Sequence, residues 1–424
     1  MNKLKQFLYL ISKPLNQIEI NKNGQTRGSF GLLERIIFTL KILFSNHSLV
    51  FKLMIFLNLI KHIFIFFLII IFLPISLILF FLNIRFANLN FTQIGALSTQ
   101  ADILIKYNLL NNNHIIVTYL PEKFVCNKVL LNLFSNHLIV IKKWYLSFLL
   151  FPFIHNWFLS IDIHKLEPSN IHSLSYKVNQ KFNKTRKDIY TNFKKNINKK
   201  YINLSKKYKK IITIHVRENN TKYGRKTSLR YSDFKNYKKS IKYLVRENYN
   251  IIRFVDKYSN FKFKNYTEIK VNSDSNQYKQ IFFIINSDFT ITNNSGVQSL
   301  SNMFNIPNLT VDSFPYHRSF NFNKFDLTNP KILKKNKKNV LLTAYLTKYM
   351  ILNAYLLKKY KLIVKNNDQD DIYLSVKEIL KKIKTKSKIR NIKIDYIKKN
   401  KIQFYGEGDL TKNFINKIRN NDIK

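Results

Sequence analysis

An uncharged and almost entirely apolar run, IFIFFLIIIFLPISLILFFL, covers residues 63–82. Its 20 residues match a hydrocarbon core of roughly 30 Å, so a single membrane-spanning helix is one interpretation. Pro74 favours another, because proline removes a backbone donor and disturbs the preceding turn, and two half-helices could enter one leaflet and return. A signal peptide is excluded by the position and length of the run. The run therefore predicts a membrane anchor.

The flanks of the run bear on its orientation. Residues 49–60 are apolar except for Lys52, with Lys61 just beyond, and predict a helix in the membrane interface. Nine Lys and Arg precede the run, whereas only Arg85 and Lys106 lie in the twenty or so residues after it. For a spanning helix, the positive-inside rule places the N-terminus in the cytoplasm and the large domain outside. A re-entrant anchor leaves both on the cytoplasmic side.

The formal net charge of +48 has several explanations. Lysine supplies most of it, and Lys, Asn, Ile and Phe share A/T-rich codons, so a biased genome explains the charge without a polyanionic partner. A basic surface facing anionic lipid head groups is an alternative. Nucleic acid is not expected as a partner, because the chain lacks RNA-binding aromatic signatures and zinc-finger spacing. The single cysteine, Cys126, excludes an intrachain disulfide and a cysteine-based metal cluster.

Arginine is scarce in this chain, and its placement is therefore informative. Only 12 of the 72 basic residues are Arg. Five of them fall in one window: Arg217, Arg225, Arg230, Arg246 and Arg253. Where a point charge suffices, lysine can replace arginine, so the retained residues indicate sites that need the planar guanidinium to hold phosphate or carboxylate.

The chain after the apolar run alternates between predicted strands and helices. Its first part favours helices at 96–107 and 121–135 and strands at 114–119 and 137–141. The Lys- and Asn-rich residues 160–208 suit a helical linker. In the second part, Ser232 is expected to cap a helix. The apolar face of that helix consists of Tyr237, Ile241, Leu244 and Val245.

The second part also predicts a regular series of further elements. Strands are expected at 211–216, 250–255, 268–271, 288–292 and 308–311, with helices at 276–285 and 296–304. This alternation is typical of a parallel, doubly wound sheet, and the fold class is therefore α/β. Ligands bind such sheets beyond the carboxyl ends of the strands.

Two motifs fall at those strand ends. In the first, a buried strand delivers His215 and Arg217 on one face, followed by Glu218. Such an arginine can hold a diphosphate, and the carboxylate could act as a base or bind a sugar hydroxyl. A plain Arg–Glu pair beside a satisfied histidine is the structural alternative. Arg230 and Arg253 could join this site, although a core-edge ion pair accounts equally well for Arg253.

The second motif is Thr292-Asn293-Asn294-Ser295-Gly296, at the start of the helix that contains Ser299. A strand that runs into small polar residues and a glycine at a helix N-terminus offers free N–H groups to an anion. Ordinary N-capping by Asn294 or Ser295 is the alternative. Because both motifs lie at carboxyl ends of strands in one predicted sheet, together they favour a single phosphate-bearing ligand.

These residues resemble a known family. The segment 85–95, then ITIHVRE, LRYSDFKNYKKSIKYLVRENYNIIRFVD and INSDFTITNNSGVQSLSNMFNIP, is similar in order to bacterial glycosyltransferases of surface-polysaccharide gene clusters. The resemblance covers roughly residues 85–330. The H-V-R motif is also similar to that of fucosyltransferases with a GT-B fold. Two departures stand out: Ala96 occupies the place of a family histidine, and Thr292 that of a family glycine.

The resemblance implies a GT-B-like fold of two Rossmann-like lobes, with a nucleotide-sugar donor in the C-terminal one. It maps six residues onto the donor cleft: His215, Arg217, Arg230, Ser295, Gly296 and Ser299. The interpretation of the motifs adds Arg253 and Asn294 as donor-binding candidates. Arg217 would bind the departing diphosphate, so that no metal ion or cofactor is required. Glu218 is the candidate general base. The triplet Asp368-Gln369-Asp370 is expected to start a helix rather than hold a metal.

The predicted organisation has five parts: a basic N-terminal segment 1–48, an anchor 49–84, an acceptor-side lobe and linker 85–205, a donor lobe 206–330 and a Lys-rich helical region 331–424. The expected partners are a nucleotide sugar, a glycan or lipid-linked acceptor, and a membrane. Because nucleotide sugars are cytoplasmic, the catalytic domain is expected at the cytoplasmic face of the bacterial inner membrane. Two alternatives remain: a non-enzymatic basic membrane-surface protein, and a degenerate member of the family that serves as an assembly partner.

Overall fold

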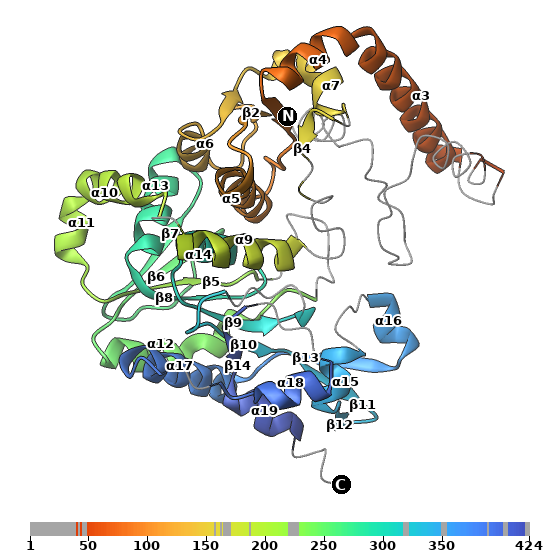
Figure 1. Ribbon diagram of the computed structural model, residues 1–424. Helices are drawn as coiled ribbons and strands as arrows, with labels where there is room; N and C mark the ends of the chain where they lie inside the picture. Colours follow the sequence, from red (N-terminus) through yellow and green to blue (C-terminus); the bar gives the residue numbers. More distant parts are fainter. Residues whose placement is uncertain are drawn as a thin grey trace. The chain divides into compact units, whose positions relative to one another are not determined.

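The structure is a computed structural model that describes residues 40, 43–44, 49–156, 158–161, 163, 171–185, 188–218, 229–316, 322–348, 354–387, 390–401 and 406–419 (Figure 1). It is a mixed α/β structure with two parallel sheets. The chain divides into two compact units. The first comprises Met1–Gln93 and Leu104–Pro168, and the second comprises Ile94–Ile103 and Ser169–Lys424.

A four-stranded sheet forms the centre of the first unit. Its strands are β1 (Ile84–Ala87), β2 (Ile115–Tyr119), β3 (Ile139–Ile141) and β4 (Ser160–Ile161). They are parallel and lie in the order β3-β2-β1-β4. The helices are α3 (Leu49–Ile71), α4 (Leu73–Phe81), α5 (Ile94–Asn111), α6 (Lys128–Phe134) and α7 (Ser147–Ile154). The first ten residues of α5 group with the second unit.

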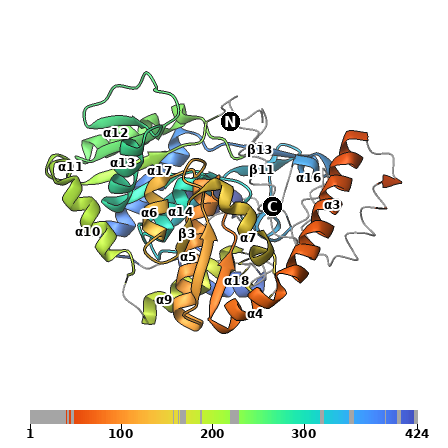
Figure 2. The same cartoon turned by 90° about the horizontal axis from the view of Figure 1, so that it is seen from above.

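The apolar run of residues 63–82 is broken rather than straight. The helix α3 ends at Ile71, and α4 begins at Leu73. Pro74 lies in the first turn of α4, where the backbone N–H groups have no acceptor within the helix, so a proline is tolerated there. No single helix of the described residues is long and apolar enough to cross a membrane. Ile63–Ile71 and Leu73–Phe81 meet those criteria only as a pair, bent by 64° (Figure 2).

The single spanning helix considered from the sequence is therefore wrong, because the chain breaks ahead of Pro74. The expected interfacial helix at 49–60 is not a separate element either, because α3 continues through it without interruption. The predicted basic segment 1–48 lies almost entirely outside the described residues.

The second unit contains a seven-stranded parallel sheet. Its strands are β5 (Ile211–His215), β6 (Asn250–Val255), β7 (Tyr266–Lys270), β8 (Ser287–Thr292), β9 (Asn308–Ser313), β10 (Leu327–Pro330) and β14 (Asp409–Leu410). Their spatial order is β14-β10-β9-β8-β5-β6-β7. Apart from β14, this is the order 3-2-1-4-5-6 of a Rossmann sheet. The expected parallel, doubly wound sheet is confirmed.

Helices cover both faces of this sheet (Figure 1). The helices α12 (Lys238–Arg246) and α17 (Gln369–Lys384) pack together over one face, and α13 (Asp274–Ile285) and α14 (Gly296–Met303) cover the other. Of the expected apolar face, Ile241 and Leu244 of α12 and Tyr237 just before the helix are buried, and Val245 is partly buried. The helix does not begin at Ser232, because Asp233 caps a short 3-10 turn, Phe234–Tyr237, that precedes α12.

The linker and the C-terminal region differ in part from their predictions. The predicted linker contains the helices α9 (Ile171–Thr185), α10 (Thr191–Lys200) and α11 (Ile202–Lys207), and these group with the second unit. The region after residue 330 is not purely helical. An antiparallel sheet of β12 (Lys338–Asn339), β11 (Ile332–Lys335) and β13 (Leu362–Lys365) accompanies α15 (Leu342–Thr347), α16 (Ala354–Lys359), α18 (Ile394–Lys399) and α19 (Lys412–Arg419). Its buried apolar residues form a separate cluster beside the large sheet.

Candidate functional site

The two sequence motifs meet at the point where the order of the large sheet reverses. The strands β5 and β8 are adjacent, with His215 opposite Thr292, but the chain leaves them toward opposite edges of the sheet. In open α/β sheets, ligands bind in the crevice outside the carboxyl ends of such strands. Residues 215–218 and 293–296 follow directly from these two ends, so the topology places both motifs at the expected ligand position.

A histidine–serine pair joins the two strand ends. The Nδ1 atom of His215 lies 3.0 Å from the hydroxyl oxygen of Ser295, which is a hydrogen bond. Ser295 is the N-cap residue of α14, yet its side chain does not cap the helix. The positive end of the α14 dipole therefore faces the strand ends without a side-chain cap. Burial and the neighbouring Arg217 lower the pKa of His215 from 6.5 to about 4, so the imidazole is neutral near pH 7.

We expect a pH dependence of stability from this histidine. Because its pKa falls on folding, its contribution is fully present above pH 6.5 and is lost as the pH falls toward about 4. Between pH 7 and 4, urea unfolding midpoints of the wild type should fall more steeply than those of His215→Gln. The comparison with the variant is needed because burial raises the pKa of Asp409 to about 6, which produces an opposite slope in the same window. Parallel curves for the two proteins would contradict the expectation.

The buried side chain of Asn293 connects the two arginine-bearing loops. Its Oδ1 atom accepts the backbone N–H of Arg217 at 3.1 Å. Its Nδ2 atom donates to the carbonyl oxygens of Arg217 and Arg230, at 3.2 and 3.1 Å. The backbone N–H of Ser232 also donates to the Arg217 carbonyl, at 3.0 Å. One carboxamide thus fixes the loop after β5 and the loop before α12 relative to the end of β8.

Replacing Asn293 by alanine should disorder both loops. The substitution leaves buried backbone groups without partners, and we expect a loss of about 1–3 kcal/mol in unfolding free energy. Asn329→Ala is the matched control, because this buried asparagine of β10 donates to Ser375 Oγ at 2.8 Å and lies in another part of the sheet. Both variants should lose stability, but only Asn293→Ala should also lose affinity for an anionic ligand. Equal ligand affinity in the two variants would refute the role of Asn293.

Two of the arginines predicted for this site, Arg217 and Arg230, lie on the loops that Asn293 holds. Arg217 is partly buried and follows His215 by two residues. Arg230 donates from Nη2 to the carbonyl oxygen of Asn294. The side chain of Asn294 is buried and donates to the Pro315 carbonyl at 3.3 Å, so it supports the turn into α14. Arg225 falls outside the described residues.

Two helix N-termini approach each other closely at a pair of glycines. A Cβ atom built on Gly95, at the start of α5, would lie 2.7 Å from the Cα atom of Gly296, at the start of α14. A Cβ atom on Gly296 would lie 2.7 Å from the backbone nitrogen of Gly95. Neither helix has a side-chain cap. Two uncapped positive ends therefore lie side by side, an arrangement that a bound anion would stabilise.

Arg253 lies in a buried ion-pair network rather than facing a ligand. Its side chain is 1% exposed, with Nη2 on Glu218 and Nη1 2.7 Å from Glu268. Its guanidinium carbon lies 3.3 Å from the centre of the Phe234 ring. For Glu268, hydrogen bonds from Ser259 and Tyr266 outweigh burial and lower its pKa. Of the two interpretations of Arg253, this geometry favours the structural ion pair.

Glu218 is the half-exposed member of this network. Its side chain is 48% exposed and its carboxylate pairs with Arg253. Burial raises the pKa of Glu218, and Arg253 acts in the opposite direction. The carboxylate is thus held in a defined orientation beside the Arg217 loop, with part of its surface open.

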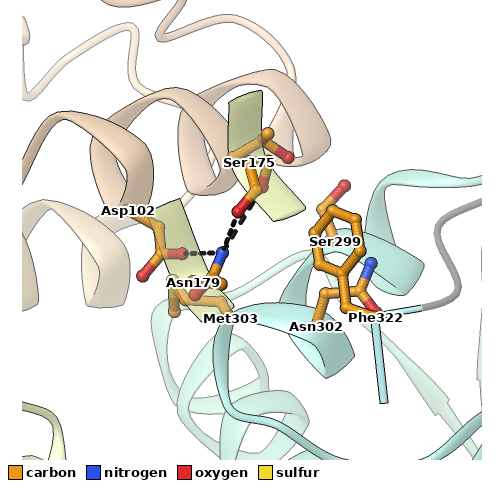
Figure 3. A pocket seen from close by; sticks show the side chains of 8 residues that line it. Asp102, Ser175, Asn179, Ser299, Asn302, Met303 and Phe322 are labelled. Carbon is orange, nitrogen blue, oxygen red and sulfur yellow. Dashed lines mark hydrogen bonds between the residues drawn. The ribbon is translucent and has the colours of Figure 1, made fainter. Parts of the chain in front are cut away.

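Ser299 borders a small polar cavity (Figure 3). The lining residues are Thr99, Asp102, Ser175, Asn179, Ser299, Asn302, Met303 and Phe322. Its volume of about 10 Å³ is room for roughly one water molecule, whereas ligand pockets typically measure hundreds of Å³. Tyr190 donates to Asp102 at 2.7 Å, and this contact and burial raise the pKa of the phenol well above its ordinary value. The cavity belongs to the packing of α5, α9 and α14.

The aspartate triplet starts a helix, as predicted. Asp368 is the N-cap of α17, and its side chain accepts a hydrogen bond from the backbone N–H of Asp371. The Asp371 side chain accepts one from the backbone N–H of Asp368, which completes a capping box. Among the described residues, no group of three His, Cys, Asp or Glu side chains has the arrangement of a metal site.

Asn293 is the functional candidate that the sequence reasoning did not single out. The neighbouring Asn294 and Ser295 were predicted as possible N-caps, but Asn293 forms the hydrogen bonds to the Arg217 and Arg230 loops. The available signal was its position as the first residue after a buried strand. A side-chain amide at this position can accept a hydrogen bond from a backbone N–H and donate to backbone carbonyls at the same time.

Comparisons with known proteins give no relationship at the sequence level. No protein-family model matches the chain, and no curated protein matches it. Among solved structures it is similar to the ADP-heptose LPS heptosyltransferase II of E. coli, with 12% identity over 55% of this chain and 86% of that one, at a TM-score of 0.32. It is also similar to a glycosyl transferase family 9 protein from Veillonella parvula, with 9% identity over 65% and 96% of the chains, at a TM-score of 0.35. At these scores, neither likeness carries an argument about this chain.

Proposed function

We propose that the chain is a glycosyltransferase of GT-B type that moves a sugar from a nucleotide-sugar donor to a glycan or lipid-linked acceptor in surface polysaccharide synthesis. One observation carries the proposal. The His215–Arg217 motif and the 293–296 turn follow adjacent strands at the switch point of a sheet with Rossmann order. The site is built for a phosphate-bearing ligand, and the sequence resemblance described above favours a nucleotide sugar.

In this proposal the charge of the leaving diphosphate is stabilised by the chain's own groups. Arg217 binds the diphosphate, with Arg230 as a second cation. The N–H group of Gly296 at the start of α14 completes the contacts, whereas the Ser295 N–H already donates to the Asn293 carbonyl. Because the positive charges come from side chains and a helix end, the reaction needs no metal ion. The neutral His215 holds Ser295 in place without adding charge.

Glu218 is the proposed general base for the acceptor hydroxyl. A base must be within hydrogen-bond reach of the proton that it takes, and it works best when its pKa approaches the operating pH. The half-exposed carboxylate and the upward effect of burial on its pKa both fit this role. Its ion pair with Arg253 acts in the opposite direction and fixes the orientation of the carboxylate.

The bent α3–α4 pair is the proposed means of membrane association. We propose that this pair, bent by 64°, enters one leaflet and leaves it again on the same side. Both flanking segments then remain on the same side, which is the cytoplasmic side if the donor is a nucleotide sugar. The proposed location is the cytoplasmic face of the inner membrane.

A ligand panel tests the donor site. We expect one of GDP-, UDP-, CMP- and dTDP-sugars to raise the melting temperature of the full chain selectively. Arg217→Ala should weaken that binding about 10- to 150-fold, since hydrogen bonds to charged groups contribute about 1.5–3 kcal/mol. Arg246→Ala is the matched control, because Arg246 is an exposed arginine of α12. The control should bind like the wild type.

The panel also separates the competing functions. Binding that Arg217→Ala retains and that salt abolishes would replace this proposal by a basic membrane-surface protein, because diffuse lysine-mediated binding is strongly salt-dependent. If no nucleotide sugar binds a folded wild type, the proposal fails in favour of a degenerate member of the fold.

A further inference from the structure

The first unit exposes many large apolar side chains along α3 and α4. Only Ile65 and Ile69 of the apolar side chains described on α3 are buried. Large apolar side chains with more than half their surface exposed are Leu49, Leu53, Leu57, Phe64, Phe67, Ile70, Ile71, Ile78, Phe81 and Leu82. An apolar surface of this kind on a protein marks an interaction site.

A second exposed segment adjoins this surface. Lys142 and Lys143 precede a 3-10 turn, η1 (Trp144–Leu146), which leads into α7. The side chains of Tyr145 and Leu149 are 54% and 66% exposed, and Trp144 is also exposed. Along 13 residues, KKWYLSFLLFPFI, the sequence passes from cations through amphipathic aromatic rings to apolar side chains. This order matches the layers of a bilayer: cations suit the lipid head groups, aromatic rings the interface, and apolar side chains the acyl chains.

The fold holds this segment firmly against α3 and α4. The Tyr119 hydroxyl donates to the Trp144 carbonyl at 3.0 Å, which fixes η1 to the end of β2. The Phe153 ring of α7 stacks on Phe86 of β1, with ring centres 5.3 Å apart, and meets the edge of Phe72, at the bend between α3 and α4, at 5.8 Å. In both views α7 lies beside the bent pair (Figures 1 and 2).

We infer that residues 142–154 are a second lipid-contacting element, which docks with α3–α4 on an anionic bilayer. This inference rests on the membrane association proposed above and extends it to a segment that is not part of the apolar run. Charge complementarity selects the partner, because Lys142 and Lys143 are exposed beside the aromatic rings and would meet anionic head groups. A protein partner would not require this sequence of cation, aromatic ring and apolar side chain.

The position of η1 also bears on the substrate. The turn follows the carboxyl end of β3, whereas α4 leads into the amino end of β1. The lipid-contacting surface thus extends from one end of the strands to the other. Because parallel sheets bind ligands at the carboxyl ends of their strands, η1 brings the bilayer to the ligand-binding edge of this sheet. Of the two acceptor classes, this favours a lipid-linked acceptor over a free glycan.

Tryptophan fluorescence offers a direct test, because Trp144 and Trp157 are the two tryptophans of the chain. In full-length Trp157→Phe, vesicles of phosphatidylglycerol and phosphatidylcholine should shift the Trp144 emission to the blue. Vesicles with brominated acyl chains should quench it. Emission that vesicles neither shift nor quench, in a protein that sediments with them, would overturn the inference and leave the α3–α4 anchor standing.

Binding measurements on substituted full-length proteins provide a second test. Leu149→Glu should weaken vesicle binding about tenfold or more, because it places a charge where an apolar side chain would be buried. Ile363→Glu is the matched control, since Ile363 is 65% exposed in β13 of the second unit. It should bind like the wild type. Equal affinities of the two variants would overturn the inference.

The lysines can be tested in the same way. Lys142→Ala with Lys143→Ala should weaken binding about thirtyfold, at ~1 kcal/mol for each lysine near an anionic surface. The adjacent exposed pair Lys337 and Lys338 serves as control. If the wild type itself does not bind these vesicles, this inference and the proposed membrane association both fall, whereas the donor site remains testable by the nucleotide panel.

Discussion

Arg253→Met is expected to lower the free energy of unfolding by about 3–5 kcal/mol, the usual result of removing one partner from a buried ion pair. The arginine bridges Glu218 and Glu268 while its guanidinium stacks on Phe234. Methionine keeps much of the side-chain volume but leaves the buried carboxylate of Glu268 without its cation. Urea unfolding at pH 7, followed by circular dichroism, measures the loss.

Arg246→Met controls for the general effect of exchanging arginine for methionine. Arg246 is exposed on α12, and its replacement should change the unfolding free energy by less than about 0.5 kcal/mol. Adding Glu268→Gln to Arg253→Met should recover part of the loss, because the unpaired charge is then removed. Equal stabilities of Arg253→Met and Arg246→Met would show that the network contributes nothing.

Gly296→Ala is expected to be the most harmful of the small substitutions in the candidate site. The added methyl group would lie 2.7 Å from the backbone nitrogen of Gly95 and still closer to the side chain of Ile94. Backbone cannot move aside as a flexible side chain does, so α5 and α14 must separate. Overpacking of this kind costs about 1–3 kcal/mol. The separation would also displace the helix end proposed to hold the diphosphate, so nucleotide-sugar binding should be lost.

Gly406→Ala serves as the reference for a glycine outside this contact. Gly406 has a φ of 124°, so alanine is strained there, but the residue lies before β14 at the far edge of the sheet. Both variants should lose stability, which unfolding midpoints measure, and only Gly296→Ala should lose the ligand-induced shift in melting temperature. Wild-type binding by Gly296→Ala would contradict the proposed role of the helix end.

Five of the seven strands of the large sheet were predictable because each carries a local signature, whereas the strands β10 and β14 were not predicted. Residues 250–255 and 308–311 are short, buried, β-rich runs between helices of ordinary length, and their alternation implies parallel pairing. The positions of the two ligand motifs followed from topology alone. These predictions hold because parallel strands share one carboxyl edge and need no knowledge of side-chain contacts.

The contacts themselves were not predictable, since they join residues far apart in the sequence. Asn293 reaches back 76 positions to Arg217, and its place directly after β8 does not reveal that partner. Likewise, whether Arg253 faces a ligand or Glu268 depends on the neighbouring strand β7. The predicted helix start at Ser232 was wrong for a local reason. Ser232 and Asp233 are both favourable N-cap residues, and the backbone conformation determines which of them caps the turn.

The tether formed by Asn293 has a consequence for how such a site can diverge. Each arginine could in principle be lost, moved or replaced independently during evolution. Here one amide fixes the backbones of both loops, so a single change at position 293 would remove both cations from the site at once. A lineage that drifts away from Asn293 would therefore keep the sheet and lose the site, which makes this residue a better marker of a working copy than either arginine.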